Sequence, residues 1–423
     1  MGAGKIDITA FDGKADFQVW GMKMRALLSH HKCLIALEES DDKWSEEQKK
    51  RKAELDEEAF NLIILSLSDS IIRKDEAAPA AARRPELVPA MFIFGDSLID
   101  NGNNNQLASL AKANYYPYGI DFQGGPTGRF SNGYNMVDTI AELLGLPLIP
   151  AFSQASGDEV LHGVNYASAA AGILDITGRN FVGRIPFNQQ IQNFQTTLDQ
   201  ITAANSTVDN VVNSIAKCIF FVGMGSNDYL NNYLMPNYPT KTQYDGQQYA
   251  SLLVDQYSKQ LTSLYNLGAR KFVLAGIGVM GCIPSILAQN AQGVCSDEIN
   301  KLVKPFNANV KMLISNLNDN LPGAKFTFID INQLFQELLT NSKSYGFSVT
   351  DRGCCGIGKN RGQITCLPFQ IPCPNRNEYV FWDAFHPTEA VNVILGRKAF
   401  NGDQTMAYPW NIEQLATLDI ESS

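Results

Sequence analysis

The 423-residue chain is 45% apolar and 18% charged, a composition typical of a globular protein with a sizeable buried core. Its formal net charge of −9 offers no basic excess for neutralising phosphates, so nucleic-acid binding is not expected. No apolar run reaches the roughly 18 to 20 residues that span a bilayer, so no membrane span is expected.

Residues 1–74 are charge-dense, and their apolar residues recur at helical spacing. Phe17, Trp20 and Met24 would share one helix face, and Ser45 with Gln48 three residues later predicts the start of a second helix. With FDGKADFQVWGMKMRALL and LSLSDSII, this small helical segment resembles the start of copia-type retrotransposon gag polyproteins. The first residues, MGAGKIDITAFDGKADF, lack the basic start and apolar core of a secretory signal, which by itself predicts a cytoplasmic location.

Residues 75–88, DEAAPAAARRPELV, separate this segment from the rest of the chain. Two interpretations stay open. The stretch is either a flexible Ala/Pro linker or the end of a cleaved secretory leader whose apolar core is missing. The predicted organisation is a helical segment over 1–74, a linker over 75–88 and a large α/β domain over 89–423.

From residue 89 onward, short apolar runs alternate with helical stripes. The runs are MFIFGDS, GVNYA, CIFFVGMGSND, KFVLAGIG and FTFIDI, which begin at residues 91, 163, 218, 271 and 326. Near-continuous apolar strands indicate burial on both faces and hence a parallel sheet. Leu253, Tyr257 and Leu261 lie on one helical stripe, and Phe306 and Val310 lie on another. The alternation predicts a three-layer, doubly wound α/β fold with a mainly parallel, flavodoxin-like sheet.

Six of the eight cysteines lie in Gly- and Pro-rich segments where loops are expected, at positions 282, 295, 354, 355, 366 and 373. Clustered loop cysteines indicate disulfides and an oxidising compartment, and the sequence leaves the pairing open. A zinc site is the alternative. The only nearby histidine is His386, however, and the spacing fits no paired Cys-x2-Cys site, so no metal is expected. Cys33 and Cys218 are expected to be buried thiols.

In such a sheet ligands bind at the carboxyl ends of the strands, so residues after each apolar run are candidates for a functional site. Ser97 follows the first run, the small-residue loop SAAAGI at 168–173 follows the second, and Asn227 follows the third. A serine hydroxyl needs a base to act as a nucleophile, and His386 lies three residues after Asp383 in FWDAFHPTEA. The carboxylate would hold one imidazole nitrogen while the other faces the serine, as in a catalytic triad.

The order and placement of these motifs resemble those of plant-type GDSL esterases/lipases of the SGNH hydrolase superfamily. The resemblance covers residues 89–399 and is carried by FGDSLIDNGNNN, PTGRFSNG, GVNYASAAAGI, GSNDYLNNYL and CCGIG...CLPFQIPCPNRNEYVFWDAFHPTEA. It implies a serine ester hydrolase that cleaves carboxylic acyl esters through an acyl-Ser97 intermediate, with no metal and no cofactor. The expected substrate is a small-molecule or lipid acyl ester.

The resemblance also implies roles for single residues. Ser97 would be the nucleophile, His386 the general base and Asp383 the group that orients His386. The Ser97 N–H and the Asn227 side chain would form part of the oxyanion hole.

A backbone N–H from the 168–173 loop would complete that hole, from either Ala170 or Gly172. An alanine keeps this donor in place provided that its φ stays negative. Asp96 is left out of the catalytic set, because a carboxylate beside the serine also serves to fix a turn.

Two alternatives to a hydrolase stay open: an acyltransferase that uses the same site, and a catalytically silent fusion that carries a gag-like interaction module. The resemblance and the cysteines predict an extracellular location, whereas a native N-terminal segment would predict a cytoplasmic one. The sequon Asn205-Ser206-Thr207 would be glycosylated only in the secretory route.

Overall fold

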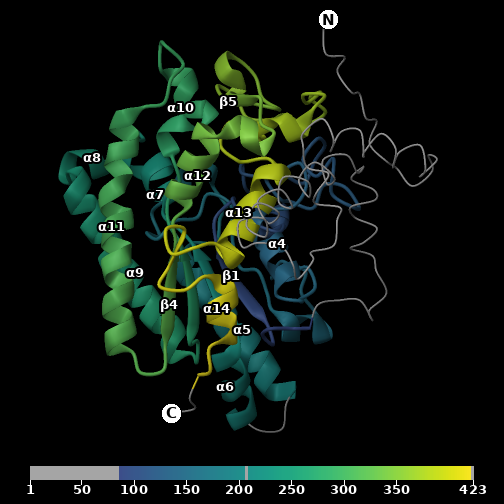
Figure 1. Cartoon of the computed structure of the whole chain (residues 1–423), viewed down its shortest axis with the longest axis vertical. Coiled ribbons are helices and arrows are strands. Elements are labelled where there is room, and N and C mark those ends of the chain that lie inside the picture. The colour runs from purple at the N-terminus through teal and green to yellow at the C-terminus, as the bar shows by residue number, and fades with distance from the viewer. Residues whose placement is uncertain (1–84, 205–207, 421–423) are drawn as a thin grey trace, which may run out of the picture. The chain divides into compact units, whose positions relative to one another are not determined.

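The structure is a computed structural model, and it describes residues 85–204 and 208–420 (Figure 1). The expected helical segment over 1–74, most of the expected linker, Cys33 and the sequon at Asn205 lie outside the described residues. The predictions about them therefore stay predictions.

A central sheet of five strands in the order β1-β2-β3-β4-β7 forms the middle of the domain. Four strands are parallel: β1 (Met91–Gly95), β2 (Ile219–Gly223), β3 (Lys271–Ala275) and β4 (Lys325–Ile329). The short edge strand β7 (Ala407–Tyr408) is antiparallel to β4. Four of the five apolar runs are thus the parallel strands that the sequence predicts.

The fifth run, 163–167, is not a continuous strand, and that part of the prediction is wrong. It makes only isolated bridges at Asn165, one of them parallel to Ile93 of β1. The Asn165 side chain accepts from the Ala167 N–H and donates to the Ile99 carbonyl, so it competes with a regular ladder. The segment still runs beside β1, since the Tyr166 N–H donates to the Ile93 carbonyl at 2.7 Å.

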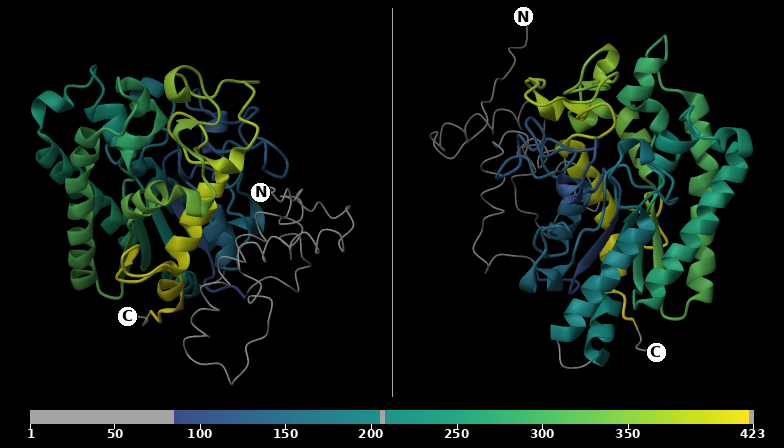
Figure 2. Two further views of the ribbon diagram at one scale, coloured as in Figure 1. Left: turned by 45° about the horizontal axis from the view of Figure 1, so that its top comes forward. Right: turned by 180° about the vertical axis from the view of Figure 1, so that it is seen from behind.

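Helices cover both faces of the sheet, as Figure 1 shows for α9 and α11 on one side and α4 and α13 on the other. One layer contains α5 (Phe187–Ala204), α6 (Val208–Lys217), α9 (Gly246–Asn266) and α11 (Asp297–Asn320). The other contains α4 (Met136–Leu143), α12 (Ile331–Thr340), α13 (Glu389–Asn401) and α14 (Ile412–Thr417). Figure 2 shows both layers from two further directions. The three-layer fold that the sequence predicts is confirmed.

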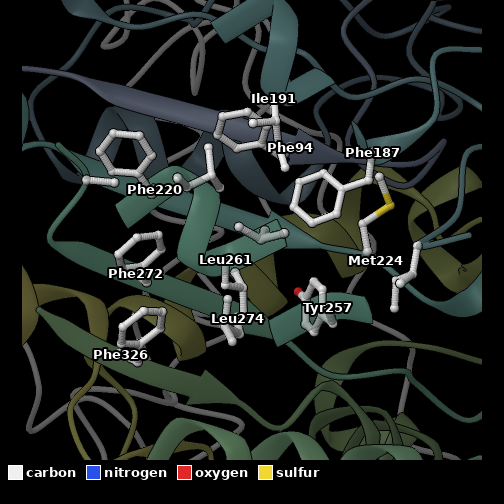
Figure 3. Close-up of a cluster of buried hydrophobic side chains, with 14 of the residues drawn as sticks. Phe94, Phe187, Ile191, Phe220, Met224, Tyr257, Leu261, Phe272, Leu274 and Phe326 are labelled. Carbon is white, nitrogen blue, oxygen red and sulfur yellow. The ribbon is translucent and has the colours of Figure 1, made fainter. Parts of the chain in front are cut away.

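Alternate residues of each strand enter the two cores between these layers. Phe92 and Phe94 of β1 lie in one core, and Met91 and Ile93 lie in the other. The first core contains an aromatic column across three strands, in which Phe272 and Phe326 stack with ring centroids 4.2 Å apart (Figure 3). Such a contact adds about 0.5 to 1.5 kcal/mol to the stabilisation from burial.

The two predicted helical stripes are confirmed. In α9, Leu253, Tyr257 and Leu261 are buried, and the helix begins with a capping box at Asp245. In α11, Phe306 and Val310 are buried. Both helices pack on the same face of the sheet, and their apolar stripes form much of its core.

Six cysteines form three disulfides, Cys282–Cys295, Cys354–Cys373 and Cys355–Cys366, so the prediction of disulfides is confirmed. Two of them lie in the connection between β5 (Val349–Gly353) and β6 (Tyr379–Phe381), which form a small sheet that the sequence did not predict. Cys218 is buried and free. Within the described ranges no group of three or more His, Cys, Asp or Glu residues could hold a metal ion.

Short helices complete the domain: α7 (Ser226–Asp228), α8 (Thr240–Gln243) and α10 (Pro284–Gln289). None of the helices in the described part of the chain combines the length and the apolar character of a membrane-spanning helix.

Candidate active site

The candidate site lies at the carboxyl end of β1, which has a different neighbour on each side. β2 is the parallel neighbour of β1 on one side, and the 163–168 segment runs along its other side. Such a switch point leaves an opening that neither connection covers. Ser97, the 168–173 loop and Asn227 all lie at this edge, as the sequence predicts.

Ser97 sits in a tight turn that depends on Gly95. A Cβ atom at position 95 would lie 2.4 Å from Ile99 Cδ1 and 2.9 Å from the Gly223 carbonyl oxygen, so only glycine fits. Gln190 of α5 fixes the same residue, because its amide accepts from the Gly95 N–H at 3.0 Å and donates to the Gly95 carbonyl at 2.9 Å. The serine therefore leaves a rigid strand end, not a free loop.

The structure brings Ser97, His386 and Asp383 together, although 289 positions separate the serine from the histidine. His386 Nε2 lies 2.8 Å from Ser97 Oγ, and His386 Nδ1 lies 2.9 Å from Asp383 Oδ1. Asp383 Oδ1 also accepts hydrogen bonds from the backbone N–H groups of Phe385 and His386, which fix the turn from Asp383 to His386. The three side chains thus have the geometry of a serine, base and acid triad.

The charge on Asp383 is stabilised by its partners. Burial alone would raise the pKa of this fully buried carboxyl, but the positive charge and the hydrogen bond of His386 hold it below its ordinary value. A hydrogen bond from Tyr118 acts in the same direction. Asp383 is therefore ionised at neutral pH and acts only as an acceptor toward the imidazole.

Two backbone N–H groups point to a site for an oxyanion. Within the described ranges, neither the Ser97 N–H nor the Ala170 N–H has an acceptor, although Ala170 is buried. A buried N–H group without a partner, such as that of Ala170, is rare in folded proteins, so together with the half-buried Ser97 it marks a place for a bound oxygen. Both residues line the same cavity.

Ala170 has φ of 66°, so the condition on which its role was predicted, a negative φ, is not met. The neighbours on each side enforce this left-handed conformation, because the Ala169 N–H donates to Asp100 and the Ala171 N–H donates to the Ser168 carbonyl. Gly172, the other candidate, is not among the residues that line the cavity. It faces the Asp228 carboxylate, which a Cβ atom at position 172 would approach to 2.7 Å.

Asn227 lies in the short helix α7 and lines the cavity. Its Nδ2 donates to the Ala171 carbonyl at 2.9 Å, and its Oδ1 accepts from Asn231 at 2.6 Å. These two bonds fix the orientation of the amide and leave one Nδ2 hydrogen for a ligand.

Three buried residues that the sequence did not assign to the site hold the 168–174 loop in place. Asp100 accepts from the Ala169 N–H, Asn104 donates to the Ala169 carbonyl, and Asp228 accepts from the Ile173 and Leu174 N–H groups. The polar run DNGNNN contains two of them, and a strongly polar run beside a buried strand was the signal that could have indicated this role.

A cavity of about 210 Å³ opens beside Ser97. Leu98, Leu110 and Phe385 line it and are also exposed, so they mark its mouth. The deeper part is apolar and enters the core between the sheet and the helices α4, α12 and α13. It is lined by Ile99, Phe221, Val279, Ile331, Phe335 and Leu395. A polar reacting group at the mouth and an apolar chain in the depth would both be accommodated.

The chain was compared with known proteins. Residues 91–399 match the family described as GDSL-like Lipase/Acylhydrolase. Among the relatives from Arabidopsis thaliana, GDSL esterase/lipase At1g71691 is 67% identical over 79% of this chain and 87% of its own length. GDSL esterases/lipases At5g45670 and At1g29670 are each 52% identical, over 80% and 84% of this chain and 94% and 97% of their own lengths. Because the family match begins at residue 91, the gag-like resemblance of residues 1–74 stays a prediction.

Asp96, the residue before Ser97, is a buried carboxyl at the edge of the cavity. Burial raises its pKa from 3.8 to about 7, against the opposing effects of the Leu98 N–H bond and of His386. The folded protein therefore holds a proton on Asp96 at pH values where the unfolded chain has released it. Stability from this group is complete below about pH 4 and is lost as the pH rises through 7.

We expect Asp96→Asn to remove this pH dependence, since the amide keeps an oxygen for the Leu98 N–H and carries no charge. Between pH 5 and pH 8 the free energy of unfolding of the variant, relative to wild type, should rise by on the order of 3 kcal/mol. Urea denaturation at several pH values measures it. Asp255→Asn, a change at an exposed position on α9, is the control, and parallel curves for wild type and Asp96→Asn would contradict the prediction.

Proposed function

The chain belongs to the GDSL-like lipase/acylhydrolase family and is a serine ester hydrolase, and we propose that Ser97, His386 and Asp383 are its catalytic triad. The single observation that supports this assignment is the unbroken chain of short contacts from Ser97 Oγ through the imidazole to the buried carboxylate. A serine turn without a base would give no activated nucleophile.

In the first half of the reaction, Ser97 Oγ attacks the ester carbonyl as its proton passes to His386 Nε2. The imidazolium then gives this proton to the departing alcohol, and the acyl group stays on Ser97 as an ester. In the second half, His386 takes a proton from water, the hydroxide attacks the acyl carbon, and the proton returns to Ser97 as the carboxylic acid leaves. Asp383 stabilises the imidazolium in both halves and is not itself protonated.

The oxyanion hole is proposed to consist of the Ser97 N–H, the Ala170 N–H and the Asn227 side chain. Among the residues that the structure describes, none accepts from the Ser97 or Ala170 N–H, and Asn227 keeps one Nδ2 hydrogen for a ligand. Donors that are fixed before the reaction need no reorganisation as the negative charge develops on the oxygen. Of the two candidates in the 168–173 loop, Ala170 is proposed, because Gly172 faces Asp228.

We expect Ser97→Ala to abolish labelling by a fluorophosphonate probe and to lower ester turnover by about 10⁴-fold or more, because the nucleophile is lost. Asn227→Ala should still be labelled, since its nucleophile and base are intact, but its kcat should fall by about 10² to 10³-fold with little change in KM. Hydrolysis of p-nitrophenyl butyrate by the purified full chain measures both effects.

Ser315→Ala, at an exposed position on α11, is the control and should keep wild-type labelling and turnover. Full turnover by Ser97→Ala would overturn the triad, whereas full turnover by Asn227→Ala would overturn only the oxyanion hole.

The substrate is proposed to be an ester of an apolar acyl chain, including lipid esters. The apolar depth of the cavity supports this, because burial of each methylene group contributes about 0.8 kcal/mol. Gly278 lines the cavity next to Ile331 and Phe335, and a Cβ atom there would lie 3.4 Å from each of them, at ordinary contact distance. A larger side chain at 278 would therefore occupy room that an acyl chain uses.

We expect Gly278→Val to lower kcat/KM for a twelve-carbon acyl ester by about tenfold relative to a four-carbon ester, as exclusion of about two methylene groups would. p-Nitrophenyl esters of increasing acyl length measure the effect. Ala291→Val, at an exposed position outside the cavity, should leave the ratio unchanged. An equal loss for both chain lengths in Gly278→Val would contradict an acyl chain at this place.

An extracellular location is proposed from the three disulfides, which persist in oxidising compartments. Two of them lie in the loop that contacts Asp383 through Thr365. We therefore expect the protein to lose activity under dithiothreitol at a concentration that reduces all three bonds, as thiol counting would show. Undiminished activity of the fully reduced protein would remove this support for an oxidising compartment.

A further inference from the structure

Tyr118 is buried and donates its hydroxyl to Asp383 Oδ2 at 2.6 Å, on the side of the carboxylate away from the backbone turn. It comes from a loop far from Asp383 in sequence, 265 positions away, and no sequence pattern pointed to it. We propose that Tyr118 is a positioning residue of the active site, which holds Asp383 in the orientation that His386 requires. The inference rests on the proposed triad.

The carboxylate of Asp383 has no contact with solvent, so its orientation and charge depend on its donors. The backbone N–H groups of Phe385 and His386 both donate to Oδ1. Tyr118, at 2.6 Å, is the nearest of the donors to Oδ2. His386 Nδ1 lies at 2.9 Å and Thr365 Oγ1 at 3.3 Å. Without Tyr118, one side of a buried anion would be held by Thr365 and the imidazole alone.

The packing around Tyr118 fixes the direction of its hydroxyl. Its ring makes edge contacts with Tyr115, Phe130 and Trp382, at centroid distances of 5.3, 5.9 and 6.2 Å. Phe130 also packs on the imidazole of His386, with centroids 5.0 Å apart. One aromatic cluster thus supports both the base and the residue that positions the acid.

The loop that contains the Cys354–Cys373 and Cys355–Cys366 disulfides also contacts Tyr118 and its neighbour Tyr115. Tyr118 Oη lies 3.3 Å from Thr365 Oγ1, and the Tyr115 hydroxyl donates to the carbonyl of Cys366 at 2.9 Å. Cys366 is bonded to Cys355, so Thr365 is held next to a covalent link. Tyr118 therefore connects Asp383 to the loop around Thr365, which the Cys355–Cys366 disulfide restrains.

Tyr118 stays a hydrogen-bond donor over the whole pH range in which the enzyme would be assayed. Burial and the negative charge of Asp383 raise the pKa of its hydroxyl well above the usual value. Two other titratable groups lie nearby: Tyr115, on which the charge of Asp383 acts, and Asp96, which interacts with His386. A phenylalanine at position 118 would leave both unchanged and remove only the donor.

The test compares Tyr118→Phe with Tyr166→Phe in the full chain with its disulfides formed. Tyr166 is equally buried, and its hydroxyl donates to Thr197 at 2.8 Å, so the control loses a similar bond elsewhere. Tyr118→Phe should lower kcat by about 10- to 100-fold, the effect of losing a hydrogen bond to an ionised group, and leave KM within twofold. Tyr166→Phe should change neither.

The pH profile separates positioning from a purely structural role. A carboxylate that has lost a donor holds protonated His386 more tightly, so the acid limb of kcat/KM should move to higher pH in Tyr118→Phe. Loss of stability alone would lower the amount of active enzyme without moving this limb. An unchanged limb and a kcat within twofold of wild type would overturn the inference.

Two further variants keep the outcome decisive. If Tyr118→Phe does not fold, Thr365→Val tests the same network, with a shift of the acid limb in the same direction supporting the inference and an unchanged profile overturning it. Ser97→Ala distinguishes the two levels of failure. Activity in Ser97→Ala would overturn the triad itself, whereas an inactive Ser97→Ala beside a fully active Tyr118→Phe would overturn only the role of Tyr118.

Discussion

The pairing of β1 on both sides is the constraint on which the site depends. Its last residue, Gly95, is in register with Gly223 of β2, and its carbonyl accepts the Ser168 N–H from the other side. Three neighbouring segments of the chain therefore end at the same edge of the sheet. Strand pairing alone therefore places the serine turn, the loop with the Ala170 N–H and the helix with Asn227 next to one another.

Buried carboxylates then make this edge rigid. Asp100 and Asp228 each accept several backbone N–H groups, and burial still raises the pKa of each to about 6. They hold the loop in which Ala170 has a left-handed backbone conformation, which alanine rarely adopts in an unconstrained chain. A buried anion is stable only when it is fully hydrogen-bonded, so each one fixes the backbone around it. The proposed oxyanion donors are thereby in place before any substrate arrives.

Sequence reasoning succeeded where the signal was local. Apolar runs located β1, β2, β3 and β4, and helical stripes located α9 and α11, because strands and helices impose a fixed spacing on buried side chains. It was wrong about 163–167, because the Asn165 side chain takes hydrogen bonds that a strand would have used. It left open which backbone N–H faces the cavity, since φ at 170 is set by Asp100 and Ser168, not by residue type.

The sequence by itself determined four strands of the central sheet, the buried stripes of α9 and α11 and the presence of disulfides, and it led to the proposal of Ser97, His386 and Asp383, because each depends on residue type and near neighbours. Only the tertiary structure decided the three disulfide pairs, the cavity and the place of Tyr118 beside Asp383. The physical reason is that Tyr118 and Asp383 are 265 positions apart, whereas the paired cysteines are only 11 to 19 positions apart but lie in loops whose course no periodicity records. Their contacts follow from how helices and loops pack on the sheet, and no local spacing in the chain records that packing.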